Sequence, residues 1–132
     1  VLQTEAALQG FKGDLLVING DVPLMTDALA ETLLRTHRKA RAQATLITTK
    51  LDDPTGYGRV LRDRGGAFKG IVEEVEATAP QRRVKEINAG IYCFRAPRVF
   101  AALRQVRPSA VKGEMRELAL LRIELNSAFK SA

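Results

Sequence analysis

The order of strand-like and helix-like segments in the first fifty residues constrains the fold most. "DLLVIN" (14–19) is a short, continuous apolar run of the kind found in strands that are buried on both faces, and "AQATLITTK" (42–50) is interpreted as a second buried strand. Between them we predict a helix from about Asp27 to Lys39, with Thr26 as its N-cap and leucines on one face. A crossover of this length predicts that the two strands are parallel neighbours.

Beyond residue 50 the pattern changes to that of a β-hairpin. Strands are expected at 59–63 and 67–74 around a turn at 64–66, followed by a loop at 77–83 with one helical turn. A strand over 86–94, with Cys93 as a buried apolar residue, precedes helices over 96–106 and 113–125. With a further helix over 1–10 that ends at Gly10, the chain is predicted to be α/β.

The length and the single cysteine narrow the class of protein. The 132 residues suit one domain with its own core, and no apolar run approaches the roughly 20 residues that cross a bilayer. One cysteine excludes an intramolecular disulfide, and no secretory leader is visible, so a cytoplasmic protein without a membrane partner is expected. The lone His37 lies at the basic end of the predicted helix and is expected to be a solvated residue.

The basic charge raises the question of a nucleic-acid partner. The net charge is +6, but the lysines and arginines fall in separate segments, and aromatic residues make up only 5% of the chain, without tryptophan. The chain therefore has few residues for a stacking surface for single strands. Solvated charged faces that steer polyanions are the preferred interpretation, rather than a dedicated nucleic-acid surface.

Two glycine-containing segments are the first candidates for a ligand site. "GDVPL" (20–24) follows the first predicted strand, where open parallel sheets bind their ligands. Gly20 allows a close backbone approach there, and Asp21 is a natural Mg²⁺ ligand, although capping of the next turn explains Asp21 equally well.

The second segment is "DPTGYGR" (53–59), which is either a turn between strands or a backbone surface for a ligand. Tyr57 would pack on a sugar ring and Gly58 leaves its N–H uncovered. Glu73 and Glu74 are consecutive and point to opposite faces, so one of them can accept hydrogen bonds from a sugar. Asn88 is a polar residue within an apolar strand, and a ligand is one way to satisfy it.

Taken together, "INGDVPL", "LDDPTGYGRV", "GIVEE" and "ATAPQRRVKEINAGIYCF" occur in an order and spacing that resemble a known family. They closely resemble the uridyltransferase (pyrophosphorylase) domain of bacterial bifunctional N-acetylglucosamine-1-phosphate uridyltransferase/glucosamine-1-phosphate acetyltransferase, over residues 1 to about 106. The resemblance implies a Rossmann-like nucleotide-diphospho-sugar transferase fold, with a mixed, mainly parallel sheet and a β-hairpin insertion. It also implies that UTP and N-acetylglucosamine 1-phosphate react to give UDP-N-acetylglucosamine and pyrophosphate, with Mg²⁺ as the cofactor.

The resemblance assigns roles to individual residues. Asp21 matches the Mg²⁺-binding aspartate, which makes it the catalytic candidate, and Gly20 precedes it in the substrate-binding segment. Tyr57 and Gly58 match the pair that meets the sugar nucleotide. Glu73 and Asn88 match the residues that bind sugar hydroxyls and line the sugar pocket.

Several departures from the family predict an internal fragment. Nothing here matches the family's glycine-rich loop and lysine, its uracil-reading segment or its downstream asparagine ligand for Mg²⁺, and Ala89 replaces the usual threonine of "EINTG". The hexapeptide repeats of the acetyltransferase domain are also missing. We therefore expect one partial domain, truncated at the N-terminus, with a parallel α/β part (1–50), a sugar-binding part (51–95) and C-terminal helices (96–132).

Three functional hypotheses remain open at this point. The chain is an enzyme fragment with little activity of its own, a non-catalytic remnant that binds sugar nucleotides or proteins, or, least favoured, a basic nucleic-acid binder. In the first two, an uncovered strand edge would favour self-association.

Overall fold

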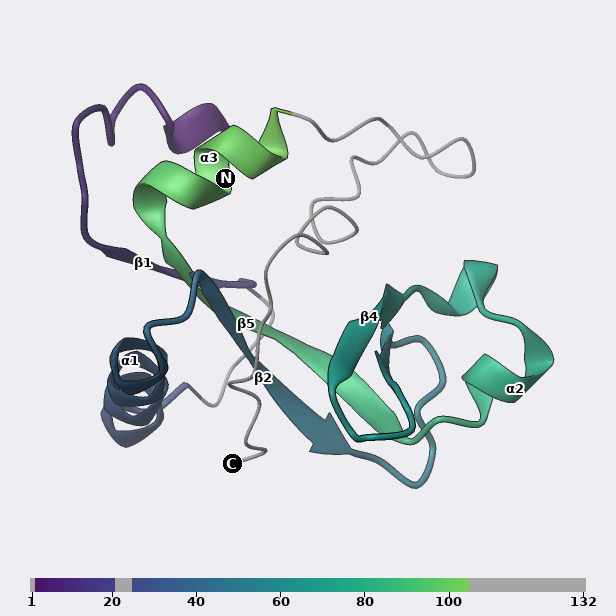
Figure 1. Ribbon diagram of the computed structural model, residues 1–132. Helices are drawn as coiled ribbons and strands as arrows, with labels where there is room; N and C mark the ends of the chain where they lie inside the picture. The colour runs from purple at the N-terminus through teal and green to yellow at the C-terminus, as the bar shows by residue number, and fades with distance from the viewer. Residues whose placement is uncertain (1, 21–24, 105–132) are drawn as a thin grey trace.

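The computed structural model describes residues 2–20 and 25–104, and one long central strand, β5 (Glu86–Arg95), organises it. The other strands of its five-stranded sheet are β1 (Asp14–Ile18), β2 (Ala44–Lys50), β3 (Arg59–Arg62) and β4 (Phe68–Val72) (Figure 1). The helices are α1 (Asp27–Ala40), α2 (Ala79–Arg82) and α3 (Ala96–Leu103), with short 3₁₀ turns η1 (Leu2–Thr4) and η2 (Glu74–Glu76). None of these helices has the length and apolar character of a membrane-spanning segment.

The two edges of β5 are used differently. Along one edge, β2 pairs with both halves of β5, from Ala44 opposite Phe94 to Lys50 opposite Glu86. The other edge is shared, because β1 pairs with residues 91–95 and β3 pairs at Ile87, opposite Arg59. Since a strand has only two edges, β1 and β3 lie end to end on the same side of β5.

This arrangement corrects the expectation that β1 and β2 are parallel neighbours in a mainly parallel sheet. Both strands run antiparallel to β5, which lies between them, and every strand pair in the described part of the chain is antiparallel. The strands β1 and β2 still run in the same direction as each other, as the crossover through α1 requires.

The apolar runs are explained by helices on both faces of the sheet. Alternate side chains of a strand point to opposite faces, and in β5 Ile91 and Cys93 pack in a cluster with Leu33 of α1. Tyr92 and Phe94 pack instead with α3. The prediction that β1 and β2 face apolar surroundings on both sides is therefore compatible with antiparallel pairing.

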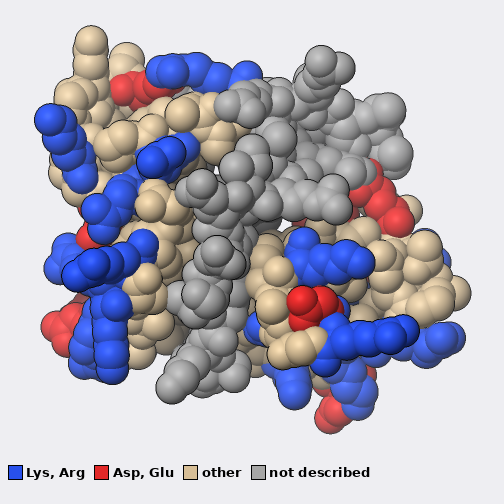
Figure 2. All heavy atoms as spheres, in the orientation of Figure 1, with Lys and Arg blue, Asp and Glu red and all other residues tan. Residues whose placement is uncertain are grey.

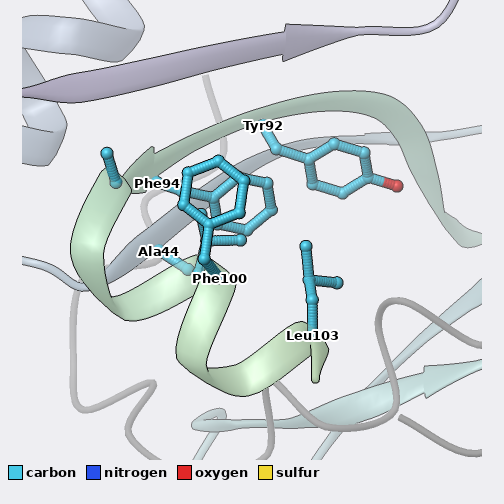
Figure 3. Close-up of a cluster of buried hydrophobic side chains, with 7 residues drawn as sticks. Ala44, Tyr92, Phe94, Phe100 and Leu103 are labelled. Atoms are coloured by element: carbon cyan, nitrogen blue, oxygen red, sulfur yellow. The ribbon is translucent and has the colours of Figure 1, made fainter. Parts of the chain in front are cut away.

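Local features that can be recognised in the sequence stabilise the helices α1 and α3. In α1 the Thr26 hydroxyl accepts a hydrogen bond from the Leu29 backbone N–H at 3.3 Å, as expected for an N-cap. In α3, Pro97 lies in the first turn, and Val99, Phe100 and Leu103 are buried against the sheet (Figure 3). Truncation of a buried leucine of this kind to alanine typically costs about 2–5 kcal/mol of stability.

Most of the remaining elements match the predictions made from the sequence. The hairpin β3–β4, the helical turn α2 and the buried Cys93 are confirmed. The helix expected over 1–10 is not formed in the described residues 2–10, where η1 is followed by turns, although Gly10 does adopt a left-handed conformation with φ of 80°. The helix expected over 113–125 lies outside the described residues.

Candidate functional site

A short gap on the shared edge of β5 brings the candidate site residues together. The pairing with β1 ends at Ile91 and the pairing with β3 begins at Ile87, which leaves residues 88–90 between the two strands. From one side the Asn19 backbone N–H donates to the Gly90 carbonyl at 3.2 Å. From the other side the Asn88 N–H donates to the Gly58 carbonyl at 2.9 Å. The loop after β1 and the loop before β3 therefore meet at this gap.

Gly20 follows Asn19 at this gap, and Asp21 is the next residue in the sequence. Gly20 is exposed, and a Cβ added to it would meet no heavy atom within 4 Å. Asp21 lies outside the described residues, so its expected role as a Mg²⁺ ligand stays a prediction. Within the described ranges no group of three or more histidine, cysteine, aspartate or glutamate side chains is placed to hold a metal.

Gly58 lies directly against Glu73. Gly58 is buried, and a Cβ built on it would lie 3.0 Å from Glu73 Oε1 and 3.0 Å from Ile71 Cγ2. Glu73 itself is exposed and follows the last residue of β4. The missing side chain of Gly58 thus lets the Glu73 carboxylate approach the backbone of the loop. The Gly58 carbonyl also accepts the hydrogen bond from the Asn88 backbone N–H.

Asn88 obtains partners from the protein itself. Its side-chain Nδ2 donates to the Tyr92 hydroxyl at 2.6 Å, and its Oδ1 accepts from the Gly90 N–H at 3.2 Å. The Tyr92 ring belongs to the core cluster with Phe94, and its hydroxyl extends away from that cluster (Figure 3). Since an amide nitrogen has two hydrogens, Asn88 can still donate one hydrogen bond to a ligand while Tyr92 fixes its orientation.

The role of Tyr92 was not apparent from the sequence. Residues four apart in a regular strand share a face but lie about 13 Å apart, so the spacing of Tyr92 and Asn88 did not predict a contact. The contact exists because β5 is irregular at this point: the register against β2 shifts between Leu46 and Thr48. Gly90, with φ of 73°, lies in the corresponding part of β5.

The loop at 53–58 is held in place by several hydrogen bonds. Asp53 Oδ1 accepts from both the N–H and the hydroxyl of Thr55, at 3.1 and 2.6 Å, and these bonds lower the pKa of Asp53. Lys85 binds the Asp52 carboxylate at 2.8 Å. Tyr57, at the end of the loop, is 48% exposed and is free to contact a ligand.

A buried arginine and a second glutamate also contact the loop. From the sequence, Arg59 had no role of its own, and Glu74 was considered only as the alternative to Glu73 for a sugar contact. Arg59 is 1% exposed and donates to the Tyr57 carbonyl, while the Glu74 carboxylate accepts from the Gly56 N–H. Glu73 and Glu74 were expected to point in opposite directions, and their contacts differ accordingly: Glu73 lies beside Gly58, and Glu74 faces Arg59 and Gly56.

His37 contradicts the expectation of a solvated residue. It is fully buried between α1 and the sheet, with Nδ1 2.8 Å from Thr45 Oγ1 and Nε2 3.6 Å from Asp14 Oδ1. Burial holds the pKa of His37 below its ordinary value, and the Asp14 carboxylate acts against this shift. Arg38 donates to Asp14 at 2.7 Å, and this hydrogen bond lowers the pKa of Asp14. None of these residues contacts the gap in the described structure, so we assign them to the stability of the fold.

Figure 2 shows where the basic side chains of the described residues gather on one face of the molecule. Lysines and arginines gather over α1 on one side, and over the hairpin and its neighbours on the other.

Comparison with known proteins identifies relatives of the chain. The family model described as "Nucleotidyl transferase" matches residues 1–123. The chain is 46% identical over 114 residues to the "Bifunctional protein GlmU" of Listeria monocytogenes, covering 86% of the chain and 25% of that protein. A protein of the same name from Synechococcus sp. is 46% identical over 115 residues, again with 25% of its length covered. The chain therefore spans about a quarter of the curated relatives that it matches.

Solved structures show the same fold at low sequence identity. A UDP-glucose pyrophosphorylase complexed with UDP-glucose has a TM-score of 0.69 at 17% identity, covering 92% of this chain and 47% of that one. A putative glucose-1-phosphate thymidylyltransferase from Bacillus anthracis has a TM-score of 0.58 at 21% identity, with 83% and 42% covered. These similarities place the fold, α/β with a hairpin insertion, among nucleotidyltransferases.

Proposed function

The chain belongs to the nucleotidyl transferase family, and on this premise we propose that it takes part in the transfer of UMP from UTP to N-acetylglucosamine 1-phosphate. The products are UDP-N-acetylglucosamine and pyrophosphate. The observation that carries the proposal is the grouping of Gly58, Glu73 and Asn88 at the gap in the sheet, in a chain that is 46% identical to GlmU proteins over this region.

In the proposed reaction these residues hold the sugar phosphate. A phosphate oxygen of the sugar phosphate attacks the α-phosphorus of UTP, the new P–O bond forms, and the bond to the β-phosphate breaks to release pyrophosphate. Glu73 would accept hydrogen bonds from sugar hydroxyls, Asn88 would donate with its remaining amide hydrogen, and Tyr57 would pack against the ring. Positioning of this kind accounts for a large part of the barrier reduction in a two-substrate reaction.

Mg²⁺ belongs to the proposal through the resemblance, with Asp21 as its ligand. When bound it would neutralise charge on the phosphates. Because Asp21 lies outside the described residues, the geometry of the gap supports the sugar-binding part of the proposal and not the metal.

Binding and turnover are tested separately. Titration with N-acetylglucosamine 1-phosphate, followed by NMR, should shift the signals of Gly58, Glu73 and Asn88. In Gly58→Arg these shifts should disappear, because the side chain would occupy the space beside Glu73. Absence of binding to the unmodified protein would exclude the proposal.

Turnover distinguishes catalysis from a binding-only role. The 132 residues contain no match to the family's glycine-rich loop, so a polypeptide of these residues alone should release pyrophosphate only at background level. Supplying that loop, on a longer chain or a second one, should produce turnover that Asp21→Ala abolishes. Sugar-phosphate binding that never leads to turnover would favour the non-catalytic alternative.

A further inference from the structure

A buried guanidinium lies beneath the loop that is proposed to receive the sugar. The Arg59 side chain is 2% exposed, and its Nη1 donates to the Tyr57 carbonyl. Its Nε donates to the Arg82 carbonyl at 3.4 Å, at the end of α2. A charge that is removed from water must be compensated by such partners, or it destabilises the fold.

Within the described residues, the carboxylate close to this guanidinium is that of Glu74, which also contacts the loop. Its Oε2 lies 3.8 Å from Arg59 Nη2, and the same oxygen accepts the hydrogen bond from the Gly56 N–H. The loop is thus bound from below at two points, Gly56 through Glu74 and Tyr57 through Arg59. Gly58 follows immediately and lies against Glu73.

We propose that Arg59 and Glu74 are positioning residues, which hold Gly56, Tyr57 and Gly58 in the conformation that receives the sugar phosphate. This inference rests on the proposed function and assigns neither residue a contact with the substrate. Adjacent glutamates then have separate tasks: Glu73 faces the ligand and Glu74 orders the loop. A loop that is ordered before binding loses less conformational freedom when the ligand arrives, which raises affinity.

The chain offers a matched pair of the same chemistry away from the loop. Arg62 binds Glu86 through two hydrogen bonds, from Nε at 2.8 Å and from Nη2 at 2.6 Å. This pair also joins β3 to β5, and Arg62 Nη1 donates to the Gly66 carbonyl at 3.1 Å, in the hairpin turn rather than in the loop at 53–58. Arg62→Lys and Glu86→Gln therefore control for loss of an arginine–glutamate pair in general.

The test compares these variants with Arg59→Lys and Glu74→Gln on the full chain, with two measurements. Without ligand, hydrogen exchange of the Gly56 amide reports the order of the loop, and exchange of the Cys93 amide reports the core. With ligand, NMR titration gives the Kd for N-acetylglucosamine 1-phosphate, at a temperature where every variant is folded.

We expect Gly56 exchange to accelerate about tenfold in Arg59→Lys and Glu74→Gln, with a similar weakening of binding, because each loses a charge-assisted hydrogen bond. Exchange of the Cys93 amide should change by less than about twofold in every variant. In the two control variants, Gly56 exchange and the Kd should also change by less than about twofold, which corresponds to a small free energy. Arg59→Lys should weaken binding more than Glu74→Gln, since glutamine keeps an acceptor for Gly56 and lysine lacks the planar fork.

Other results would overturn the inference. If the unmodified protein binds the sugar phosphate and Arg59→Lys and Glu74→Gln bind as tightly as the controls, the pair does not position the loop and the proposed function stands. If Cys93 exchange accelerates as much as Gly56 exchange, the pair only stabilises the fold. If the unmodified protein does not bind at all, the proposed function fails, and the ligand-free exchange alone decides whether the pair orders the loop.

Discussion

At the scale of single residues, Gly58 is the position where one methyl group should have the clearest effect. Its absent Cβ would lie 3.0 Å from both Glu73 Oε1 and Ile71 Cγ2, closer than side chains normally pack. Glu73 Oε1 ends a flexible side chain and can move, whereas Ile71 Cγ2 belongs to a stiff β-branched side chain in β4, so Gly58→Ala should cost about 1–3 kcal/mol of stability. It should also displace Glu73 and weaken binding of N-acetylglucosamine 1-phosphate several-fold, as measured by titration.

Gly65→Ala is the matched control for this prediction. Gly65 lies in the hairpin turn, where an added Cβ would approach only Asp63 Oδ1, at 3.4 Å. This variant should bind the sugar phosphate like the unmodified protein. Equal affinity of Gly58→Ala and Gly65→Ala would show that Glu73 does not depend on the space beside Gly58.

His37 predicts a pH dependence of stability. In the folded state burial lowers the pKa of His37 below its ordinary value of 6.5. The positive charges of Arg95 and Arg38 lower this pKa further, and the Asp14 carboxylate raises it in part. The unfolded chain therefore takes up a proton first as the pH falls. Stability should be greatest above about pH 6.5 and decrease below it, with a slope of up to about 1.4 kcal/mol per pH unit until the folded state is also protonated.

Urea denaturation between pH 7.5 and 5 measures this slope. His37 is the only histidine in the chain, so His37→Gln should remove the slope in this range while keeping a partner for Thr45. A slope that survives in His37→Gln would mean that another group is responsible. Protonation of Asp14, whose pKa is lowered chiefly by its hydrogen bond to Arg38, should cause a separate loss of stability at more acidic pH, below about 3.8.

At the scale of elements, the irregularity in β5 depends on Gly90. Its φ of 73° is unfavourable for other residues, and an added Cβ would lie 2.6 Å from Asn19 Nδ2. Gly90→Ala should therefore destabilise the protein by about 1–3 kcal/mol. The two causes are the unfavourable φ and the collision with Asn19. Denaturation midpoints of Gly90→Ala alone and combined with Asn19→Ala separate them, because Asn19→Ala relieves the collision and leaves the φ unchanged. An unaltered midpoint in Gly90→Ala would contradict the conformation of this strand.

The sequence predicted most elements but not how the strands pair. The bounds of α1, β1 and β5 follow from apolar runs and caps, which are local signals. The predicted pairing of β1 with β2 was wrong. Apolar runs indicate that both faces of a strand are covered, here by helices, but they do not indicate which strands are neighbours. In this fold β5, which is much later in the sequence, lies between β1 and β2.

Predictions about the site had a similar limit. Gly58, Glu73 and Asn88 were singled out by a motif, and the structure brings them together around the gap in the sheet. Arg59 and Tyr92 were missed, the contacts of Glu74 with the loop were not foreseen, and His37 was placed in solvent, because each depends on contacts between distant segments. A buried arginine and an exposed one have the same letter in a sequence, and only the fold distinguishes them.

At the scale of the whole molecule, the outer edge of β1 is the feature with the largest consequence. In the strand order β1-β5-β3-β4, β1 comes first and pairs only with β5 among the described residues. Its apolar side chains are incompletely buried: Leu15, Leu16 and Val17 are partly buried, and Ile18 is exposed. An apolar strand with open backbone donors and acceptors favours pairing with another chain.

We therefore expect a polypeptide of these 132 residues to self-associate at low micromolar concentration, which sedimentation velocity would measure. Ile18→Lys should reduce the association, because a charge on a strand edge opposes pairing, and Ile18 is exposed enough, at 40%, for the change to spare the core. Phe11→Lys is the matched control, since Phe11 is similarly exposed, at 44%, but lies outside the strands. Equal association in the two variants would mean that general surface hydrophobicity drives it, and a compact monomer of the unmodified chain would show that the β1 edge is covered.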